Sequence, residues 1–390
     1  MIKLCLSVLI LFSVITLCNA SDFKIFGKIT TVDNEIYTGY ITWNHSKTLW
    51  IDFFEAGKVE NLYTTYFNKS TGIKFQQNGE IHYTPSIHQF SCRFGNMKKI
   101  RLIAPNKIEL ELKGNQKLVL KKGQYNDIGT PVRLENDTLQ LDFIWDHISE
   151  IEFMSSPSSG VQQLSFGVVK SNHASYTGII EWNNRGQNNA KQFHIYAYSK
   201  EVNIPLRLIK KIERKSEQSI TIFTDQHDYN IKTAHSNNNQ QKSVTVLMPN
   251  IGKVIIPWDH LETLEFTPQE SHKLLSYNDF KSPEALQAEI LTQDGERLIG
   301  TVAYDLDESL NCEIIEGMND NITYFIPLRY IQSIEPKNYL YSFVTLKNGS
   351  ALSLGDMQDM NLDNNGIMVF IPQQLPVYVP WNEVKKITFR

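Results

Sequence analysis

The sequence predicts an all-β fold of three tandem repeats, each built of two small β-barrels. Short runs of alternating apolar and polar residues are separated by turn dipeptides such as Asn348-Gly349, a pattern typical of antiparallel hairpins. Two longer phrases also recur three times, in the same order along the chain. Recurrence of this kind indicates one structural unit that is used repeatedly.

The first phrase reads YTGYITWN, YTGIIEWN and LIGTVAYD, and its common residue is Gly39, Gly178 or Gly300. The second phrase reads FIWDHISEIEF, IPWDHLETLEF and VPWNEVKKITF, and its common residue is Trp145, Trp258 or Trp381. The spacing from glycine to tryptophan is nearly equal in the second and third copies and longer in the first. We therefore expect repeats over residues 23–153, 162–266 and 284–389, with an insertion in the first at about 55–85.

Each repeat divides into two similar halves. Four halves end on a proline followed by aliphatic residues four and seven positions later, as in Pro205, Ile209 and Ile212. Proline cannot donate to a sheet ladder, so it belongs at the start or edge of a strand. A hairpin, a middle strand, a tight turn and a closing strand would make a barrel of about five strands, whose closure protects the edges. The glycine of the first phrase would permit a close approach of the neighbouring backbone.

This pattern of turn, apolar residue, glycine, Ile-Pro and spaced isoleucines resembles small SH3-like or Sm-like barrels. The whole chain also resembles exported bacterial repeat proteins of uncharacterised function. In the third copy, Asp307 and Asn311 have a spacing similar to the RNA-contacting Sm signature. However, Leu328-Arg329-Tyr330 stands where the second Sm signature has Arg-Gly. The resemblance therefore does not carry RNA binding over to this chain.

The first twenty residues predict a signal peptide, because Lys3 precedes an apolar run and small residues surround Ala20. The apolar run is shorter than the roughly 20 residues needed to cross a bilayer, and no later segment has a membrane-spanning pattern. We expect cleavage after Ala20 and a periplasmic or extracellular location. Processing would leave only Cys92 and Cys312, which we expect to be buried free thiols, with a bridge between them as the alternative.

The net charge of −4 gives the chain no overall attraction for nucleic acid or anionic membranes. A run of basic residues between Lys98 and Lys122 is a local exception. These residues lie on an alternating strand pattern, so we expect the solvated face of a hairpin. A site for an anionic polymer is the alternative.

Aromatic residues supply the candidate binding positions. They are Trp43, Trp182, Tyr63, Tyr66 and Phe67. The two tryptophans occupy equivalent positions, where they could either stack on a sugar or a proline-rich peptide, or fill a barrel core. Tyr37 and Tyr176 offer the same two interpretations. The other three lie in the insertion, which could make a specific contact or cover the first repeat as an end cap.

The remaining motifs indicate structure rather than chemistry. Trp-Asp-His occurs twice, but the third copy reads Trp381-Asn382-Glu383. We therefore interpret the phrase as a tight turn that the aspartate caps and whose tryptophan lies in the core. The stretch 359–366 is similar to a calcium loop but lacks the glycine and glutamate of an EF-hand. We expect an Asn/Gly-rich turn there, with calcium binding as the alternative, and no other metal or cofactor.

The sequence thus predicts an exported, non-catalytic binding or scaffolding protein of the cell envelope or extracellular space. Its repeated units would engage a protein or polysaccharide partner by multiplying weak contacts. The alternative is a hydrolase of envelope polymers that uses carboxylates between repeats. These carboxylates are Asp305, Asp307, Glu313 and Glu316. Two carboxylates facing each other in a deep cleft would favour the enzyme, and a shallow surface with rim aromatics would favour binding.

Overall fold

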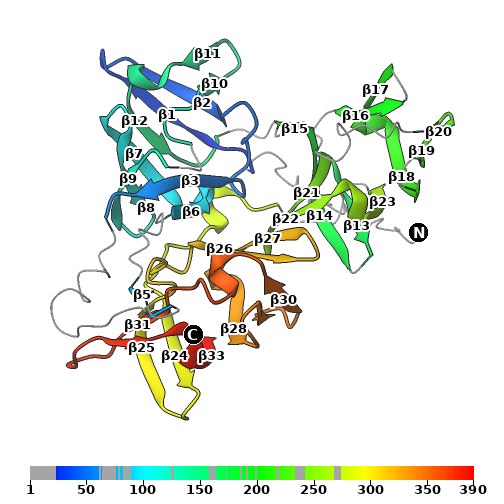
Figure 1. Cartoon of the computed structure of the whole chain (residues 1–390). Helices are drawn as coiled ribbons and strands as arrows, with labels where there is room; N and C mark the ends of the chain where they lie inside the picture. The colour runs from blue at the N-terminus through cyan, green and yellow to red at the C-terminus, as the bar shows by residue number, and fades with distance from the viewer. Residues whose placement is uncertain are drawn as a thin grey trace, which may run out of the picture.

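The computed structural model describes residues 23–390 except 61–62, 64–75, 78–79, 82–88, 124–126, 158–163, 173, 185–186, 190–191, 198–199, 217–218, 233–241 and 268–273. The predicted signal peptide therefore lies outside the described residues. In the described part of the chain every regular element is a β-strand or a 3-10 turn (Figure 1). None of its helices is long and apolar enough to span a membrane. The chain is all-β, as the sequence predicts. We refer to residues 23–153, 162–266 and 284–389 as the first, second and third segments.

The first segment forms a ten-stranded antiparallel sheet in the order β11-β10-β2-β1-β12-β7-β8-β9-β3-β6. Its strands are β1 (Phe26–Thr31), β2 (Ile36–Trp43), β3 (Phe53–Lys58), β6 (Gln89–Arg93), β7 (Met97–Ala104), β8 (Lys107–Leu112), β9 (Lys117–Lys121), β10 (Val132–Glu135), β11 (Gln140–Phe143) and β12 (Ile148–Phe153). Two 3-10 turns, η1 (Phe94–Asn96) and η2 (Trp145–His147), precede β7 and β12. β4 (Gln76–Gln77) and β5 (Glu80–Ile81) pair separately. The insertion expected at about 55–85 begins within β3 and ends before β6, and most of it lies outside the described residues.

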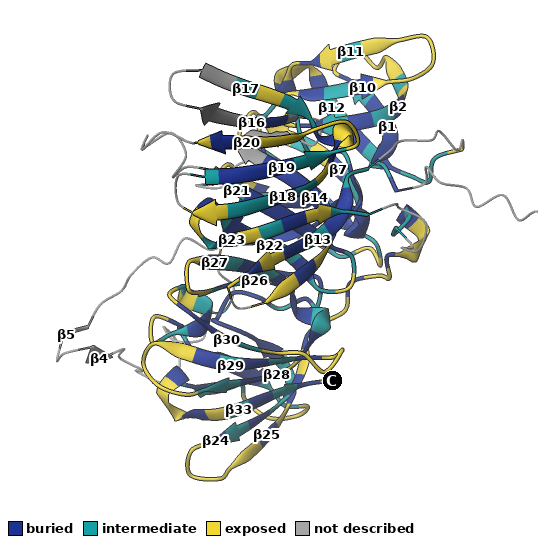
Figure 2. Cartoon of the chain, turned by 90° about the vertical axis from the view of Figure 1, so that its right-hand side faces the viewer, coloured by how far each residue is buried: buried dark blue, intermediate teal, exposed yellow. Residues whose placement is uncertain are grey.

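The second and third segments share a 19-stranded sheet. The second contributes β13 (Phe166–Ser171), β14 (Ser175–Asn184), β15 (Gln187–Asn189), β18 (Ile209–Ser216), β19 (Ser219–Thr224), β20 (Asp228–Lys232), β21 (Lys242–Met248), β22 (Gly252–Pro257) and β23 (Leu261–Phe266); β16 (Gln192–Ala197) and β17 (Lys200–Pro205) pair apart. The third contributes β24 (Gln287–Thr292), β25 (Arg297–Ala303), β26 (Ile314–Asn319), β27 (Ile322–Pro327), β28 (Ile331–Pro336), β29 (Tyr341–Leu346), β30 (Ala351–Gly355), β31 (Ile367–Phe370), β32 (Val377–Val379) and β33 (Val384–Phe389). Figure 2 shows β18, β23, β22, β27 and β26 following one another across the junction.

The three segments share one pattern of strand pairing. The opening strand pairs with the next strand and with the last, as β1 does with β2 and β12, β13 with β14 and β23, and β24 with β25 and β33. The closed barrels expected from the sequence are not seen, because no sheet of the described residues closes on itself. Instead β22 of the second segment pairs with β27 of the third. This pairing joins the two segments into one sheet.

The recurring glycine is required by the close approach of a neighbouring strand. A Cβ at Gly39 would lie 2.5 Å from the carbonyl oxygen of Glu135, and one at Gly300 would lie 2.3 Å from that of Phe370. Gly178 meets the carbonyl of Leu247 in the same way, at 2.3 Å. The first recurring phrase is therefore a packing requirement of strands β2, β14 and β25.

The second phrase forms the expected tight turn. The 3-10 turns η2, η4 (Trp258–His260) and η9 (Trp381–Glu383) carry tryptophans that are at most 5% exposed. No side chain caps these turns, so the aspartate of Trp-Asp-His is not the cap that we expected.

The linker before the third segment packs against the first segment. It contains the short turn η6 (Tyr277–Asp279), closed by a capping box between Ser276 and Asp279. The Tyr277 ring packs 4.6 Å from that of Trp50, and its hydroxyl donates to the carbonyl of Met97 at 2.9 Å. The first and third segments are thus held beside each other, as Figure 1 shows.

Candidate functional site

The two candidate tryptophans are core residues. Trp43 is 0% exposed and Trp182 is 1% exposed. The Trp43 ring packs 5.7 Å from those of Phe54 and Trp145, and its Nε1 donates to the carbonyl of Asp127 at 3.1 Å. Neither indole presents a face to solvent, so the structure places both in the cores of their segments rather than at a rim.

Of the aromatic residues in the insertion, only Tyr63 is among the described residues; Tyr66 and Phe67 lie outside them. Tyr63 is half-buried, and its ring lies 6.0 Å from that of Phe370 in β31. This part of the insertion therefore contacts the third segment.

An open groove of about 260 Å³ lies at one end of the first core, between β2 and β11. Tyr37 lines it, with its ring 5.4 Å from that of Phe143 in a T-shaped contact. The exposed carboxylates of Asp33 and Glu35 lie along the same groove, and Glu35 accepts a hydrogen bond of 2.7 Å from the Tyr37 hydroxyl. Tyr37 therefore combines a part-exposed ring with polar neighbours along an open groove.

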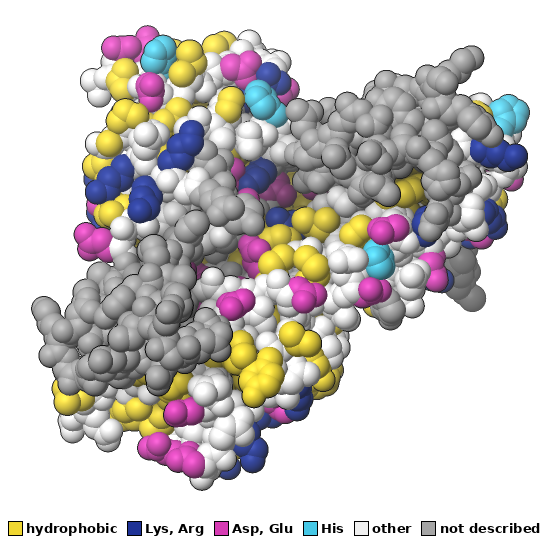
Figure 3. Space-filling model, in the orientation of Figure 1, with side chains coloured by type: hydrophobic (Ala, Val, Ile, Leu, Met, Phe, Trp, Pro, Cys, Tyr) yellow, Lys and Arg dark blue, Asp and Glu magenta, His cyan; other side chains and the backbone are white. Residues whose placement is uncertain are grey.

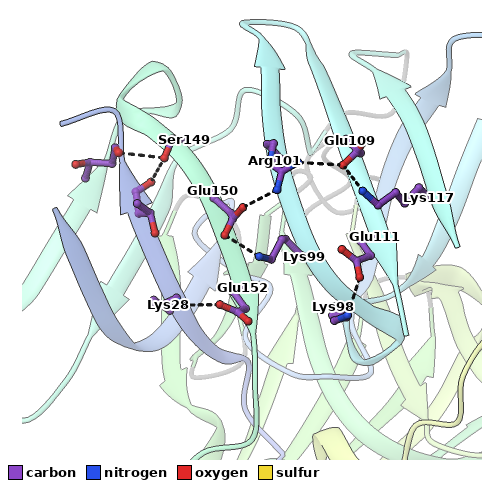
Figure 4. Close-up of polar contacts among 12 residues, drawn as sticks. Lys28, Lys98, Lys99, Arg101, Glu109, Glu111, Lys117, Ser149, Glu150 and Glu152 are labelled. Carbon is purple, nitrogen blue, oxygen red and sulfur yellow. Dashed lines mark hydrogen bonds and ion pairs between the residues drawn. The ribbon is translucent and has the colours of Figure 1, made fainter. Parts of the chain in front are cut away.

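Part of the basic run of the first segment is paired with cross-strand carboxylates (Figure 4). Lys98 pairs with Glu111 at 2.6 Å, and Lys99 pairs with Glu150 at 2.9 Å. Arg101 reaches both Glu150 and Glu109, at 3.3 and 3.4 Å. Figure 3 shows both basic and acidic side chains over the first segment. These pairs support the solvated hairpin face, because Lys98, Lys99, Arg101 and Lys117 have carboxylate partners.

The carboxylates suggested between repeats do come together, at the junction of the first and third segments. Lys58, at the end of β3, projects into the third segment and pairs with Asp307 at 2.9 Å and with Glu313 at 2.5 Å. Burial alone would lower the pKa of Lys58, but the charges of Glu313 and Asp307 outweigh it and raise that pKa. This lysine therefore neutralises two of the four carboxylates.

A buried ion cluster in the first segment surrounds Lys47, which follows β2. Its ammonium group donates to Asp127 Oδ2 at 2.6 Å, to Glu55 Oε2 at 3.0 Å and to the carbonyl of Phe53 at 2.7 Å. Burial alone would raise the pKa of Glu55, but the charges of Lys47 and Lys253 hold it below its ordinary value. We call Lys47, Glu55 and Asp127 the lysine cluster.

The third segment contains the same framework. The Glu55 amide donates to Asp127 Oδ2 at 2.8 Å, and the amide of Glu316 donates to Asp359 Oδ2 at 2.6 Å. An isolated bridge joins Trp43 to Lys47, and an equivalent bridge joins Tyr304 to Glu308. Glu308 therefore occupies the position of Lys47, and Asp359 occupies that of Asp127.

Replacing the lysine by Glu308 creates a group of carboxylates. One carboxylate oxygen from each of Asp305, Glu308 and Asp359 lies within 4.8 Å of the others. Asp305 is 3% exposed and Glu308 is 7% exposed. We call these three residues the carboxylate cluster. They are the described residues that could hold a metal ion.

The electrostatics of the carboxylate cluster are unfavourable for negative charge. Burial, and then the charge of Asp359, raises the pKa of Asp305 well above its ordinary value. Burial and the neighbouring charges of Asp307, Asp359 and Asp305 do the same for Glu308. Burial and the charge of Glu316 raise the pKa of Asp359 to about 7.

The turn expected at 359–366 is present beside the carboxylate cluster. Asn364 Oδ1 accepts a hydrogen bond of 2.9 Å from the Gly366 amide, and Gly366 has a φ of +88°. The sequence analysis identified Asp305 and this turn separately but missed Glu308. The available signal was the substitution of lysine by glutamate eight positions after the aligned Gly39 and Gly300.

Comparison with known proteins supplies no relative for this chain: it matches no protein-family model, no curated protein and no solved structure.

Proposed function

We propose that this chain is an exported, non-catalytic binding or scaffolding protein of the cell envelope or extracellular space. It consists of three copies of one unit, each with two SH3-like halves, and it engages a protein or polysaccharide partner. The common strand pairing of the three segments supports the repeat architecture.

The groove beside Tyr37 is the observation that carries the binding function. It combines an aromatic ring with the exposed carboxylates of Asp33 and Glu35. Aromatic rings pack against sugar rings or apolar peptide side chains, and carboxylates accept hydrogen bonds from hydroxyl or ammonium groups. The groove is also open and shallow. A shallow surface with aromatic residues favours binding, whereas a hydrolase would need two carboxylates facing each other in a deep cleft.

The equivalent tyrosine of the second segment supports a contact function for this position. Tyr176 is 5% exposed, and its hydroxyl hydrogen-bonds that of Tyr324 in the third segment at 2.6 Å. The same strand position thus makes an intersegment contact in the second segment, whereas Tyr37 lines an open groove.

The hydrolase alternative has weaker support. A retaining or inverting hydrolase needs one carboxyl group as an acid and another as a nucleophile or base at the substrate. Here Asp307 and Glu313 are paired with Lys58, and Asp305 is 3% exposed. This burial favours a role within the protein over contact with a polymer.

The test compares wild type with Tyr37→Ala. Ile299→Ala, on the exposed side of β25, is the matched control, because Ile299 is 46% exposed. Each variant is expressed as the full chain, checked by circular dichroism, and used for capture from an envelope extract and for binding to a glycan array. We expect one protein or glycan to be retained by wild type and Ile299→Ala, and reduced at least about tenfold by Tyr37→Ala. Absence of any partner, or equal retention by Tyr37→Ala, would overturn the proposal.

A further inference from the structure

In the part of the chain that the structure describes, no cationic side chain forms an ion pair with the carboxylate cluster. Asp305 is held by hydrogen bonds from Gln358 Nε2, at 2.7 Å, and from the Asn365 amide. Asp359 accepts from the amide of Glu316 at 2.6 Å. These donors are neutral, so they orient the carboxylates without cancelling their charge.

One oxygen of the cluster is buried without a partner. Glu308 Oε2 has no hydrogen-bond partner among the described residues, and Glu308 is buried, with only 7% of its surface exposed. An unpartnered carboxylate oxygen is costly to bury. It lies within reach of two further carboxylates, so the three residues have the geometry of a cation site.

The lysine cluster shows what that group must be. There the ammonium of Lys47 lies between Asp127 and Glu55 and supplies one positive charge. In the third segment the same position is a carboxylate, so the residue that supplied the cation now adds an anion. The charge of Lys58 also reaches Glu308, but the ammonium group of Lys58 forms its ion pairs with Asp307 and Glu313.

We propose that a hard divalent cation, of the Ca²⁺ or Mg²⁺ class, binds between the carboxylates of Asp305, Glu308 and Asp359. The donor atoms are carboxylate oxygens, which suit hard cations rather than metals that prefer thiolate or imidazole. Two positive charges would offset most of the three negative charges that the cluster carries when ionised. The cation fixes β25, η8 (Gln358–Met360) and the turn before β31 to one another, since Asp305 follows β25 and Asp359 lies in η8.

This inference does not depend on the groove at Tyr37, and its test reads out the metal directly. The full mature chain is treated with a chelator and then titrated with Ca²⁺ or Mg²⁺ by calorimetry, in a background of K⁺ that keeps the ionic strength constant. We expect one divalent ion per chain and a higher melting temperature when it is bound, because a ligand of the native state stabilises that state.

Two variants of Glu308 make the test specific. Glu308→Gln keeps the shape of the side chain and removes its charge, and we expect it to weaken cation binding at least about tenfold. Glu308→Lys reproduces the lysine cluster, so we expect it to abolish cation binding and to melt at a temperature that no longer depends on Ca²⁺ or Mg²⁺. Glu296→Gln, an exposed glutamate of the same segment, is the control and should bind as wild type does.

Two results would overturn the proposal. The first is that wild type binds neither Ca²⁺ nor Mg²⁺ at millimolar concentrations, which would mean that protons neutralise the carboxylates instead. The second is that Glu308→Gln and Glu308→Lys bind the cation as tightly as Glu296→Gln. Circular dichroism of each variant shows whether it has folded, and either Glu308 variant alone suffices for the comparison.

Discussion

The lysine cluster and the carboxylate cluster are two versions of one buried polar site. In each cluster an aspartate Oδ2 accepts a hydrogen bond from a backbone amide. Asp127 accepts from Glu55 in β3 at 2.8 Å, and Asp359 accepts from Glu316 in β26 at 2.6 Å. They differ at two positions. Glu308 stands where the first segment has Lys47, which replaces a cation by an anion, and Asp305 stands where it has Asn44. Glu316, the counterpart of Glu55, is not one of the three residues of the carboxylate cluster.

The comparison shows that equivalent positions beside a buried aspartate hold a lysine in the first segment and a glutamate in the third. Buried charges are stable only when they are paired and hydrogen-bonded. The first segment meets this requirement with a side chain. We infer that the third segment meets it with an ion from solution, so its stability becomes linked to the ionic composition of its surroundings.

The strongest test of the comparison converts the first segment into the third. We expect Lys47→Glu to lower the free energy of unfolding by about 4 kcal/mol, because it removes the ammonium group that contacts both Glu55 and Asp127 and adds a third anion. Urea denaturation of the full chain measures the loss. We further expect Ca²⁺ to recover part of it.

Lys121→Glu is the control for that substitution, since Lys121 is exposed and a charge reversal there should change the free energy of unfolding by less than about 0.5 kcal/mol. Equal stability of Lys47→Glu and Lys121→Glu would show that the lysine cluster does not need its cation.

Lowering the pH should reduce the free energy of unfolding by an amount smaller than that expected for Lys47→Glu. The pKa of Glu55 is lowered in the folded chain, so its ionised form stabilises the native state. That contribution is complete above the unfolded-state pKa and is lost as the pH falls through the lower folded-state value. Glu55→Gln removes it, so we expect the variant to be less stable than wild type by about 1 kcal/mol at pH 7.

Urea denaturation across the acid range measures this difference. The gap between wild type and Glu55→Gln should close as the pH falls through the folded-state pKa of Glu55. A gap that stays constant with pH would show that Glu55 acts through its shape rather than its charge.

The smallest effect is expected on the exposed ladder of the first segment. Lys98 pairs with Glu111 at 2.6 Å, but 44% of its side chain is exposed. Solvent screens such a pair, so Lys98→Ala should change the free energy of unfolding by less than about 0.5 kcal/mol. A loss comparable to that of Lys47→Glu would remove the contrast between buried and exposed ion pairs.

Much of the fold could be predicted from local sequence signals. Gly39 and Gly300 mark equivalent strands because a side chain there would collide with a neighbouring carbonyl, and this requirement preserves the phrase around each glycine. The expected free thiols, Cys92 and Cys312, are both buried and unbridged. Closure of the barrels could not be predicted correctly, because the pairing of β22 with β27 joins different segments.

The candidate site was harder to predict than the fold. The repeat positions of Trp43 and Trp182 could not distinguish a core residue from a rim residue, because both uses favour a large aromatic side chain. Glu308 could be identified as a site residue only by aligning it with Lys47, because the repeats have residues of opposite charge at this position. Its partner Asp359 is distant in sequence, and the hydrogen bond that places it comes from a backbone amide, which leaves no trace in side-chain identity.

The pairing of Lys58 with Asp307 also bears on the order of folding. The two residues are 249 positions apart. A ribosome adding 5–20 residues per second needs roughly 12 to 50 s to make that length of chain. During this interval the first segment has no partner for Lys58, so the junction of the first and third segments can form only when synthesis is nearly complete. Assembly of the two ends is therefore a late step, and its rate sets how long the buried face of the first segment stays open to other contacts.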